Sequence, residues 1–322
     1  MNVIVTGGAG FLGSHLSLYH LRQGDKVIIL DNFSSSKRNS PHLDMLKAYQ
    51  NKNQALIEDV DICDTNALCA LHSFKPFDVI YNFACPASPP VYQSMPVETL
   101  LTCTLGTRNV FDLATKDHSI VVHASTSEVY GDPTENPQSE TYRGNVNSYG
   151  PRSCYDEGKR AAEALCFDYL HHRNIDVRLV RIFNTYGPHL DMHDGRVVSN
   201  FIRQALNGED LTIYGEGAQT RSFCYVDDLI RGIVSLSALP GNLNQPINLG
   251  NPYEFTVQEL ADLVLAMIPN SVSRIVREKL PIDDPCQRRP DISVANQILN
   301  WEPQIKLIDG LQKTIQYAKN TQ

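Results

Sequence analysis

The amino-acid sequence predicts a doubly wound parallel α/β sheet with a smaller C-terminal substrate-binding region, on three observations. A glycine-rich stretch follows the first apolar segment and opens a segment with helical spacing. Short β-branched segments then alternate with helical ones through the first half of the chain, which is typical of a parallel sheet with helices on both faces. The right-handed crossover rule leaves the doubly wound, Rossmann-type arrangement as the main candidate.

The expected elements follow from hydrophobic periodicity, taken in chain order. Strands are expected where runs are short, apolar and β-branched, at residues 3–5, 27–30, 55–57, 79–82, 120–123 and 177–181. Helices are expected where apolar residues recur with helical spacing, at residues 11–22, 97–116 and 155–172.

Beyond residue 184 this rhythm weakens, because glycines and prolines punctuate shorter elements. We therefore expect residues 1–184 to form the Rossmann domain and residues 185–322 to form mainly a substrate-binding region. One strand and one helix around residues 211–250 are expected to return to the main sheet. A hydrophobic fraction of 42% over 322 residues is enough for a core of this size.

Composition excludes several classes of protein. A net charge of -8 argues against a nucleic-acid partner, and no apolar run reaches the ~18 residues of a membrane helix. The first strand starts at the N-terminus, so we expect no signal peptide or membrane anchor. The 8 cysteines contain no Cys-x-x-Cys pair, which predicts unpaired, buried thiols in the reducing cytoplasm. No metal site is expected, since the i, i+4 pair His189 and His193 falls in a Gly/Pro/Asp loop.

The glycine-rich stretch predicts a dinucleotide site. Gly7, Gly10 and Gly13 directly follow the first strand and allow a tight turn with close backbone approach to a pyrophosphate. Phe11 and Leu12 open the helix, whose N-terminus offers free N–H groups and a partial positive charge. The alternative is a plain glycine turn.

Asp31 closes the second strand and predicts the choice of cofactor. A carboxylate there can accept both hydroxyls of an adenosine ribose and repels a 2′-phosphate, which favours NAD over NADP. Asn32 is assigned to the same cofactor site. Lys37 and Arg38 follow in a polar loop and keep NADP open as the alternative.

Further residues are assigned to the cofactor along the carboxyl edge of the sheet. Asp61 and Ile62 follow the third strand and would flank the adenine, although a helix-capping aspartate is the alternative. Small residues after the fourth strand, Ala84 and Ala87, leave room for the ribose and nicotinamide. Thr102 is also assigned to the cofactor.

Tyr155 and Lys159 lie one helical turn apart and predict acid-base chemistry. A free tyrosine has a pKa of ~10, and the Lys159 charge favours the phenolate. Lys159 can also hold the nicotinamide ribose. Thr126 ends an apolar strand and can hydrogen-bond the reacting hydroxyl, while Glu128 could orient a sugar or move a proton. The alternatives are a core tyrosine with a solvated lysine, and a loop glutamate.

Basic residues in the second half predict an anion site against the acidic background. A diphosphate needs bidentate donors, which arginine supplies. Each such arginine could instead be a solvated surface charge. The candidates are Arg196, Arg221, Arg288 and Arg289.

Together these motifs resemble the extended short-chain dehydrogenase/reductase superfamily. Longer strings over essentially the whole chain are similar to the UDP-glucuronate decarboxylase (UDP-xylose synthase) family. They are ACPASP at 84–89, STSEVYGD at 125–132, CYDEGKR at 154–160, RIFNTYGP at 181–188, DGRVVSNF at 194–201, DDP at 283–285, RRPD at 288–291 and WEP at 301–303.

The resemblance implies NAD-dependent conversion of UDP-glucuronate into UDP-xylose through a 4-keto intermediate. It implies that Asn184 and Arg221 hold the diphosphate and that Arg288 lies by the diphosphate or the reacting end of the sugar. Arg196 would support cofactor or substrate, and Ser127 replaces the aspartate that the related dTDP-glucose 4,6-dehydratases use in dehydration. The family also pairs two helices across a two-fold axis, which implies a homodimer.

Two positions depart from the family pattern. Leu101 stands where a lysine associated with the sugar acid is usual, and Cys103 stands where an asparagine is usual. A nucleotide-sugar 4,6-dehydratase or 4-epimerase therefore stays open as the alternative function. A non-catalytic NAD-binding scaffold is a more distant one, and release of carbon dioxide separates these hypotheses.

Overall fold

The computed structural model describes residues 1–71, 76–279 and 287–321. Its centre is a seven-stranded sheet in the order β11-β6-β5-β4-β1-β2-β3, and every pair in it is parallel. This confirms the predicted fold class. The strands are β1 (Asn2–Thr6), β2 (Lys26–Asp31), β3 (Ala55–Asp59), β4 (Val79–Asn82), β5 (Ile120–Thr126), β6 (Val177–Ile182) and β11 (Ile247–Leu249).

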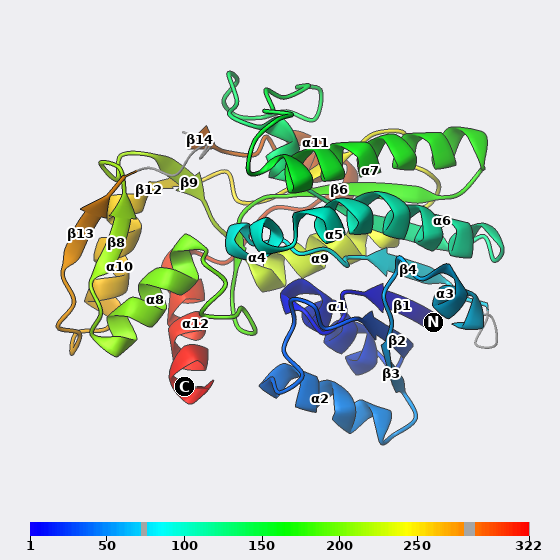
Figure 1. Ribbon diagram of the computed structural model, residues 1–322, viewed down its shortest axis with the longest axis horizontal. Coiled ribbons are helices and arrows are strands. Elements are labelled where there is room, and N and C mark those ends of the chain that lie inside the picture. The colour runs from blue at the N-terminus through cyan, green and yellow to red at the C-terminus, as the bar shows by residue number, and fades with distance from the viewer. Residues whose placement is uncertain (72–75, 280–286, 322) are drawn as a thin grey trace.

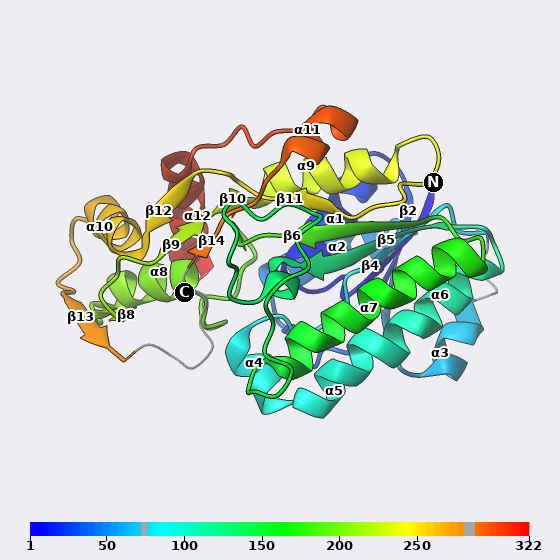
Figure 2. The same ribbon diagram turned by 90° about the horizontal axis from the view of Figure 1, so that it is seen from above.

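Helices cover both faces of this sheet (Figures 1 and 2). One face carries α1 (Phe11–Arg22) and α9 (Val226–Ser237), and the other carries α6 (Thr107–Thr115) and α7 (Ser153–His172). Because side chains alternate along a strand, Val3 and Val5 of β1 join the cluster that contains α9, while Ile4 joins the one that contains α6. The two buried clusters fix the layered arrangement.

The helix expected at residues 97–116 is divided into three parts. They are α5 (Pro96–Leu101), the π-helical turn η2 (Thr102–Gly106) and α6. The Thr102 and Thr104 hydroxyls donate to carbonyls four residues earlier, each at 2.8 Å. Such side chains compete with the backbone ladder and disturb a regular helix, which the apolar pattern alone does not reveal.

Helix α2 (Pro41–Gln50) was missed by the periodicity. Its start nevertheless carries a local signal, because Ser40 caps the backbone N–H of Leu43 and a proline occupies the first helical position. Short helix α3 (Thr65–Ala70) packs on α6, and short helix α4 (Pro89–Ser94) packs on α5 and α7.

The part of the chain beyond residue 184 adds elements to the main sheet and also forms a separate group of helices and strands. Strand β11 pairs with β6, and α9 packs on β5 and β6. Other elements form a separate group at one end of the molecule (Figure 1). These are α8 (Val197–Asn207), the parallel pair β8 (Leu211–Tyr214) and β13 (Ile275–Glu278), α10 (Val257–Met267) and α12 (Leu307–Thr321).

A three-stranded sheet lies between this group and the main sheet. Strand β9 (Thr220–Ser222) runs between β12 (Glu254–Thr256) and β14 (Gln287–Arg288). The remaining described elements are the short pair β7 (Thr185–Tyr186) and β10 (Cys224–Tyr225), helix α11 (Ser293–Leu299) and the 3-10 helix η3 (Ser127–Tyr130) after β5. The DDP string at 283–285 lies outside the described residues.

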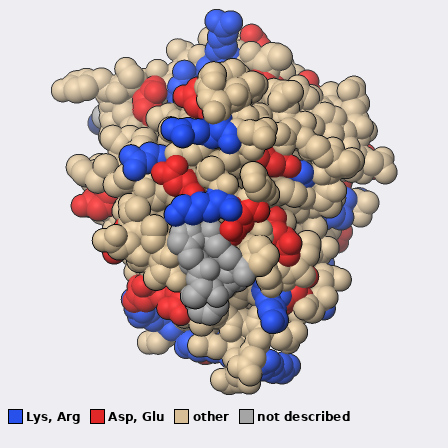
Figure 3. Space-filling model, turned by 90° about the vertical axis from the view of Figure 1, so that its right-hand side faces the viewer, with Lys and Arg blue, Asp and Glu red and all other residues tan. Residues whose placement is uncertain are grey.

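The seven described cysteines are all unpaired. Cys69 is exposed, so the expectation of buried thiols is wrong there, and Cys286 lies outside the described residues. Within the described ranges, no helix is long and apolar enough to span a membrane, and no metal-binding group of His, Cys, Asp and Glu was found. On the face drawn in Figure 3, basic and acidic side chains are interspersed.

Candidate active site

A cavity of about 1220 Å³ opens at the carboxyl ends of the sheet strands, where doubly wound proteins bind ligands. Residues from both halves of the chain line it. Among the residues predicted from the sequence, Arg289 does not line the cavity, so its assignment to the anion site is not supported. The other predicted site residues lie on the cavity wall: Gly7, Gly10, Phe11, Leu12, Gly13, Asp31, Asn32, Asp61, Ile62, Ala84, Ala87, Thr102, Thr126, Ser127, Glu128, Tyr155, Lys159, Asn184, Arg196, Arg221 and Arg288.

Close packing around the turn between β1 and α1 requires glycine at Gly7 and at Gly13, in the first turn of α1. Gly7 has a φ of 65°, and a Cβ on it would lie 2.8 Å from the Phe83 carbonyl oxygen. A Cβ on Gly13 would lie 2.1 Å from the Gly7 carbonyl oxygen. The bare backbone leaves a cradle at the N-terminus of α1, whose first N–H groups have no partner within the helix. This cradle fits the diphosphate of a dinucleotide.

Asp31, at the end of β2, is buried and anchors the loop that follows. One carboxylate oxygen accepts from the Ala9 N–H at 3.0 Å, and the other accepts from Phe33 N–H at 2.9 Å and Ser36 Oγ at 2.7 Å. These contacts fix the carboxylate at the cavity wall, where an adenosine ribose would meet it.

The two basic residues of that loop are bound to other groups. Lys37 pairs with Asp191 at 2.8 Å, and Arg38 pairs with Asp59 and stacks 4.1 Å over the Phe33 ring. The Lys37 ammonium and the Arg38 guanidinium are therefore both paired with carboxylates, and neither is positioned to bind a 2′-phosphate.

NAD is expected to bind at least about tenfold more tightly than NADP, a difference of roughly 1.4 kcal/mol. The reason is that Asp31 faces the ribose position while Lys37 and Arg38 are paired with carboxylates. Calorimetric titration of the stripped protein with each dinucleotide measures this. Equal affinity, or tighter NADP, would show that the loop rearranges to present its basic side chains.

Tyr155 lies on α7 with its ring stacked on Tyr92 from α4, the centroids 5.0 Å apart and the planes 5° from parallel. Lys159 is buried, donates to the Ala124 carbonyl at 2.9 Å and lies 5.8 Å from the Tyr155 ring centroid. Tyr92 could not be predicted from local sequence patterns, because only the fold brings the two rings together.

The pKa of Tyr155 differs from the expectation. Burial of the phenol, and then the nearby Cys85 sulfur, raise its pKa well above the ordinary value, although the hydrogen bond with Thr126 opposes them. The sequence predicted that Lys159 would favour the phenolate. In the protein alone, burial is the larger effect.

Glu128 is the centre of a buried ion-pair cluster. Arg288 donates from Nη1 to Glu128 Oε1 at 2.8 Å and to Ser127 Oγ at 2.9 Å, and from Nη2 to the Gly131 carbonyl at 3.0 Å. Arg152 pairs with the other Glu128 oxygen. Burial acts to raise the pKa of Glu128, but Arg288 and Arg152 lower it to about 2. In the protein alone the carboxylate is therefore ionised at neutral pH, which favours its predicted role in orienting a group over that of a proton donor.

Asp156 is a second carboxyl group in this cluster, and no sequence motif pointed to it. Its Oδ1 is buried and has no hydrogen-bond partner among the described residues, and its Oδ2 lies 3.9 Å from Arg152 Nε. Burial, and then the charge of Glu128, raise the pKa of Asp156 to about 7. The two neighbouring carboxyl groups thus have very different affinities for a proton.

Asp156→Asn is expected to stabilise the protein more at pH 8 than at pH 5. The folded pKa of about 7 exceeds the ordinary 3.8, so the native state loses stability as pH rises between those values. The pKa of Asp156 belongs to the coupled pair with Glu128, so the full pKa difference cannot be assigned to Asp156 alone. We therefore expect the free energy of unfolding to rise by roughly 1–3 kcal/mol at pH 8 in Asp156→Asn. Chemical unfolding at both pH values measures it. Asp262→Asn, on the exposed face of α10, is the control, and an equal gain at both pH values would contradict the assignment.

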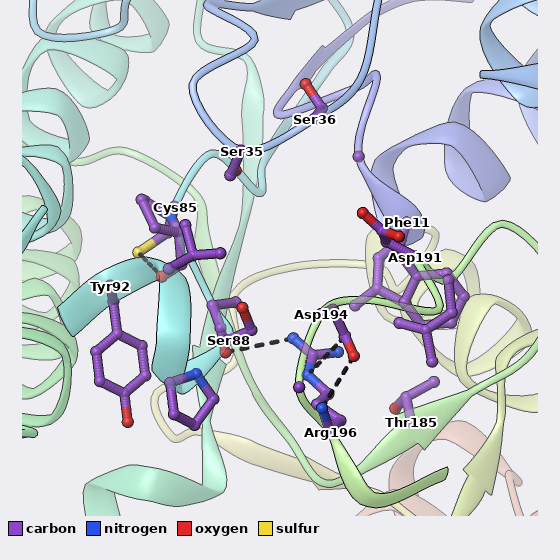
Figure 4. Close-up of a pocket in the computed structure, with 18 of the residues that line it drawn as sticks. Phe11, Ser35, Ser36, Cys85, Ser88, Tyr92, Thr185, Asp191, Asp194 and Arg196 are labelled. Carbon is purple, nitrogen blue, oxygen red and sulfur yellow. Dashed lines mark hydrogen bonds and ion pairs between the residues drawn. The ribbon is translucent and has the colours of Figure 1, made fainter. Parts of the chain in front are cut away.

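The remaining arginines approach the cavity from the C-terminal region. Arg221 and Arg288 are register partners on β9 and β14, so they project from adjacent strands. Arg196 donates to the Ala87 carbonyl at 3.3 Å and pairs with Asp194 at 3.4 Å (Figure 4). Arg196 thereby links the C-terminal region to the loop after β4.

Neither departure from the family pattern lies on the cavity wall. Leu101 is 45% exposed, whereas Cys103 is 1% exposed and packs behind the wall. The position at which the family pattern has a lysine associated with the sugar acid, Leu101 here, therefore does not line the cavity of a single chain.

Comparison with known proteins agrees with this geometry. The model of the NAD dependent epimerase/dehydratase family matches residues 3–250. UDP-glucuronic acid decarboxylase 1 of Danio rerio is 47% identical over 318 residues, which cover 98% of this chain and 72% of that protein. UDP-glucuronic acid decarboxylase 6 of Arabidopsis thaliana is 48% identical over 313 residues, which cover 97% and 87%.

A solved structure shows the same architecture with ligands bound. UDP-glucuronic acid 4-epimerase of Bacillus cereus, in complex with UDP-glucuronic acid and NAD, superposes with a TM-score of 0.87 at 26% identity, covering 99% of both chains. The resemblance inferred from the sequence is thus confirmed. The chain belongs to the NAD dependent epimerase/dehydratase family, whose cofactor is NAD, and its curated relatives there are UDP-glucuronic acid decarboxylases.

Proposed function

We propose that this protein decarboxylates UDP-glucuronate to UDP-xylose through a 4-keto intermediate. The observation that carries the proposal is the buried cluster of Glu128, Ser127 and Arg288 beside Tyr155 on one cavity wall. It offers charged groups for an anionic sugar, and a serine stands where dehydration would need an aspartate. Relatives at 46–48% identity with the decarboxylase name support the same substrate.

The glycine cradle at the α1 N-terminus would hold the NAD diphosphate, Asp31 the adenosine ribose and Lys159 the nicotinamide ribose. When bound, NAD supplies an acceptor for the hydride from carbon 4 and a positively charged ring that favours the Tyr155 phenolate. We further propose that residues 185–322 mainly bind the sugar nucleotide, with Asn184 and Arg221 on its diphosphate.

Tyr155 would remove the proton from the hydroxyl at carbon 4, with Thr126 hydrogen-bonded to the same hydroxyl. The resulting ketone lies β to the carboxylate at carbon 5, so carbon dioxide can leave with its electrons stabilised as an enolate. Arg288, held by Glu128, would supply the positive charge that stabilises that enolate. Since Glu128 stays ionised, it would orient a water for reprotonation and not supply the proton itself.

A second candidate is epimerisation at carbon 4, which the Bacillus cereus structure with UDP-glucuronic acid and NAD favours. Both reactions begin with the same oxidation and diverge when carbon dioxide leaves. The higher identity to the decarboxylases, 47% against 26%, places decarboxylation first.

Mass spectrometry of the products separates these candidates. Incubation of the NAD-loaded protein with UDP-glucuronate is expected to give UDP-xylose, lighter by carbon dioxide, without net NADH. A product of unchanged mass would favour the epimerase. Loss of water from dTDP-glucose, with UDP-glucuronate untouched, would favour a dehydratase.

The outer faces of α5 and α7 support a homodimer. Val97, Leu100, Leu101 and Phe167 are between 40% and 63% exposed on these two adjacent helices. Apolar side chains gathered on one surface commonly mark an interface. We propose that a second copy packs there about a two-fold axis, as the family resemblance implies.

Phe167→Asp is expected to convert the dimer into a monomer, because a charge would be buried against the partner copy. Light scattering after size exclusion measures the mass. Val272→Asp, at an 80% exposed position elsewhere, is the control and should stay dimeric. A monomeric parent, or a dimeric Phe167→Asp protein, would contradict this interface.

We also propose a cytoplasmic location, since seven unpaired cysteines fit a reducing compartment. Cell fractionation with antibody detection tests this.

A further inference from the structure

Two cysteine side chains touch at the edge of the cavity. The sulfur atoms of Cys85 and Cys103 are 3.3 Å apart, although 17 residues separate them in the sequence. Cys85 lies in the segment after β4, and Cys103 lies in the π-helical turn η2. A disulfide has an S–S distance of about 2.05 Å, so the sulfurs need approach by only ~1.3 Å to form one.

The two thiols differ in access. Cys85 lines the cavity (Figure 4), and its sulfur also lies 3.3 Å from the Pro86 carbonyl oxygen. Cys103 is 1% exposed and packs against α7, where a Cβ on Gly158 would lie 3.1 Å from the Cys103 Cβ. A small oxidant in the cavity can therefore reach Cys85 but not Cys103.

They also differ in acidity. The pKa of Cys85 is lowered, first by its hydrogen bond with Cys103 and then by the charge of Lys159. Burial and the nearby Cys154 act in the opposite direction but are outweighed. The hydrogen bond with Cys85, and burial, raise the pKa of Cys103. The accessible thiol is thus the one that ionises more easily, and thiolates are the forms that react with oxidants.

We propose that Cys85 and Cys103 form a reversible thiol switch that responds to peroxides. The Cys85 thiolate attacks a peroxide oxygen and the O–O bond breaks, which gives a sulfenic acid at Cys85. The leaving oxygen takes up the proton that Cys85 lost and departs as water or an alcohol. The Cys103 sulfur then attacks the Cys85 sulfur, the S–OH bond breaks, and the hydroxyl leaves as water with the Cys103 proton. The two thiols lose two electrons in total, and the peroxide gains them.

The disulfide should impair the cavity. Thr6 Oγ1 holds the backbone N–H groups of Phe83 and Ala84, each at 3.1 Å, and Arg196 holds the Ala87 carbonyl. Drawing Cys85 toward η2 pulls on this anchored segment, which forms the wall next to Tyr155 and Lys159. Misplacement of about 1 Å can cost ~10²-fold in rate, so we expect turnover to fall at least about tenfold.

Peptide mapping after oxidation tests the switch. The NAD-loaded protein is treated with hydrogen peroxide, alkylated and digested, with and without later dithiothreitol. We expect a linked Cys85–Cys103 peptide and a tenfold loss of turnover, both reversed by dithiothreitol. Cys103→Ser should form no linked peptide and should carry Cys85 on to sulfinic acid. Cys69→Ser, at an exposed site, is the control and should respond like the parent.

Several outcomes would overturn the proposal. One is oxidation confined to Cys69 or to Cys286, whose peptides are followed separately. Another is a linked peptide that forms without loss of turnover. Only the turnover readout rests on the proposed decarboxylation, whereas the linked peptide is detected by mass alone. If Cys103→Ser does not fold, Cys85→Ser serves instead and must abolish the linked peptide.

Discussion

Tyr155→Phe is expected to fold and to bind NAD like the parent protein, yet to lose at least the ~10²-fold of turnover typical of a general acid-base group. The substitution removes only the phenolic oxygen. The ring that stacks on Tyr92 at 5.0 Å remains, so packing should be preserved. Turnover of UDP-glucuronate, calorimetric NAD titration and the melting temperature together measure the three parts of this expectation.

Tyr92→Phe is the matched control. The Tyr92 hydroxyl is buried without a hydrogen-bond partner among the described residues, so its removal should cost little turnover. Retained activity in Tyr155→Phe would remove Tyr155 from the mechanism. An equal loss in both variants would instead attribute the effect to the ring stack.

Arg288→Lys is expected to lower turnover about 10²-fold, comparable to the loss of an oxyanion-type donor. The guanidinium contacts both Glu128 oxygens, Ser127 Oγ and the Gly131 carbonyl, and it is 1% exposed. A lysine keeps the charge but cannot reproduce this fork. Steady-state kinetics should show the loss in kcat, and the loss of hydrogen bonds to a charge should reduce stability by about 1–3 kcal/mol.

The next residue supplies the control for this variant. The Arg289 side chain is 40% exposed and makes a 3.7 Å ion pair with Glu254, so Arg289→Lys should change turnover by less than about twofold, as exposed pairs contribute little. Full activity in Arg288→Lys would mean that the cluster around Glu128 only stabilises the fold.

Local patterns were sufficient to predict six of the seven strands of the main sheet and the glycine turn beside it. The glycine turn, the strand alternation and Asp31 each depend on residues close in sequence. Arg288 and Glu128 are 160 residues apart in the sequence. Their residue types predicted that both lie in the active-site region, but not that they contact each other. Tyr92, Arg152 and Asp156 were missed because their importance comes from neighbours that the fold supplies.

The pKa directions could not be predicted from residue types alone. Lys159 beside Tyr155 suggested an easier ionisation, but burial of the phenol outweighs it in the protein. Similarly, Glu128 next to Asp156 gave no indication that one would bind a proton near pH 7 and the other near pH 2. Burial and the positions of Arg152 and Arg288 decide both values.

The C-terminal region was harder to predict because its strands are short and pair over long sequence distances. Strand β8 pairs with β13, and β9 pairs with β14, across helices and loops. The π-helical turn and the meeting of Cys85 with Cys103 also depend on packing between elements. Periodicity contains no information on such pairings.

Turnover of UDP-glucuronate in heavy water tests the proposed decarboxylation most directly. The product is expected to be UDP-xylose with one deuterium, at carbon 5, because a solvent proton replaces the lost carboxylate. Carbon 4 should carry none, since the hydride removed there is returned to the same carbon. A product that keeps its carboxylate, or one with deuterium at carbon 4, would contradict the account.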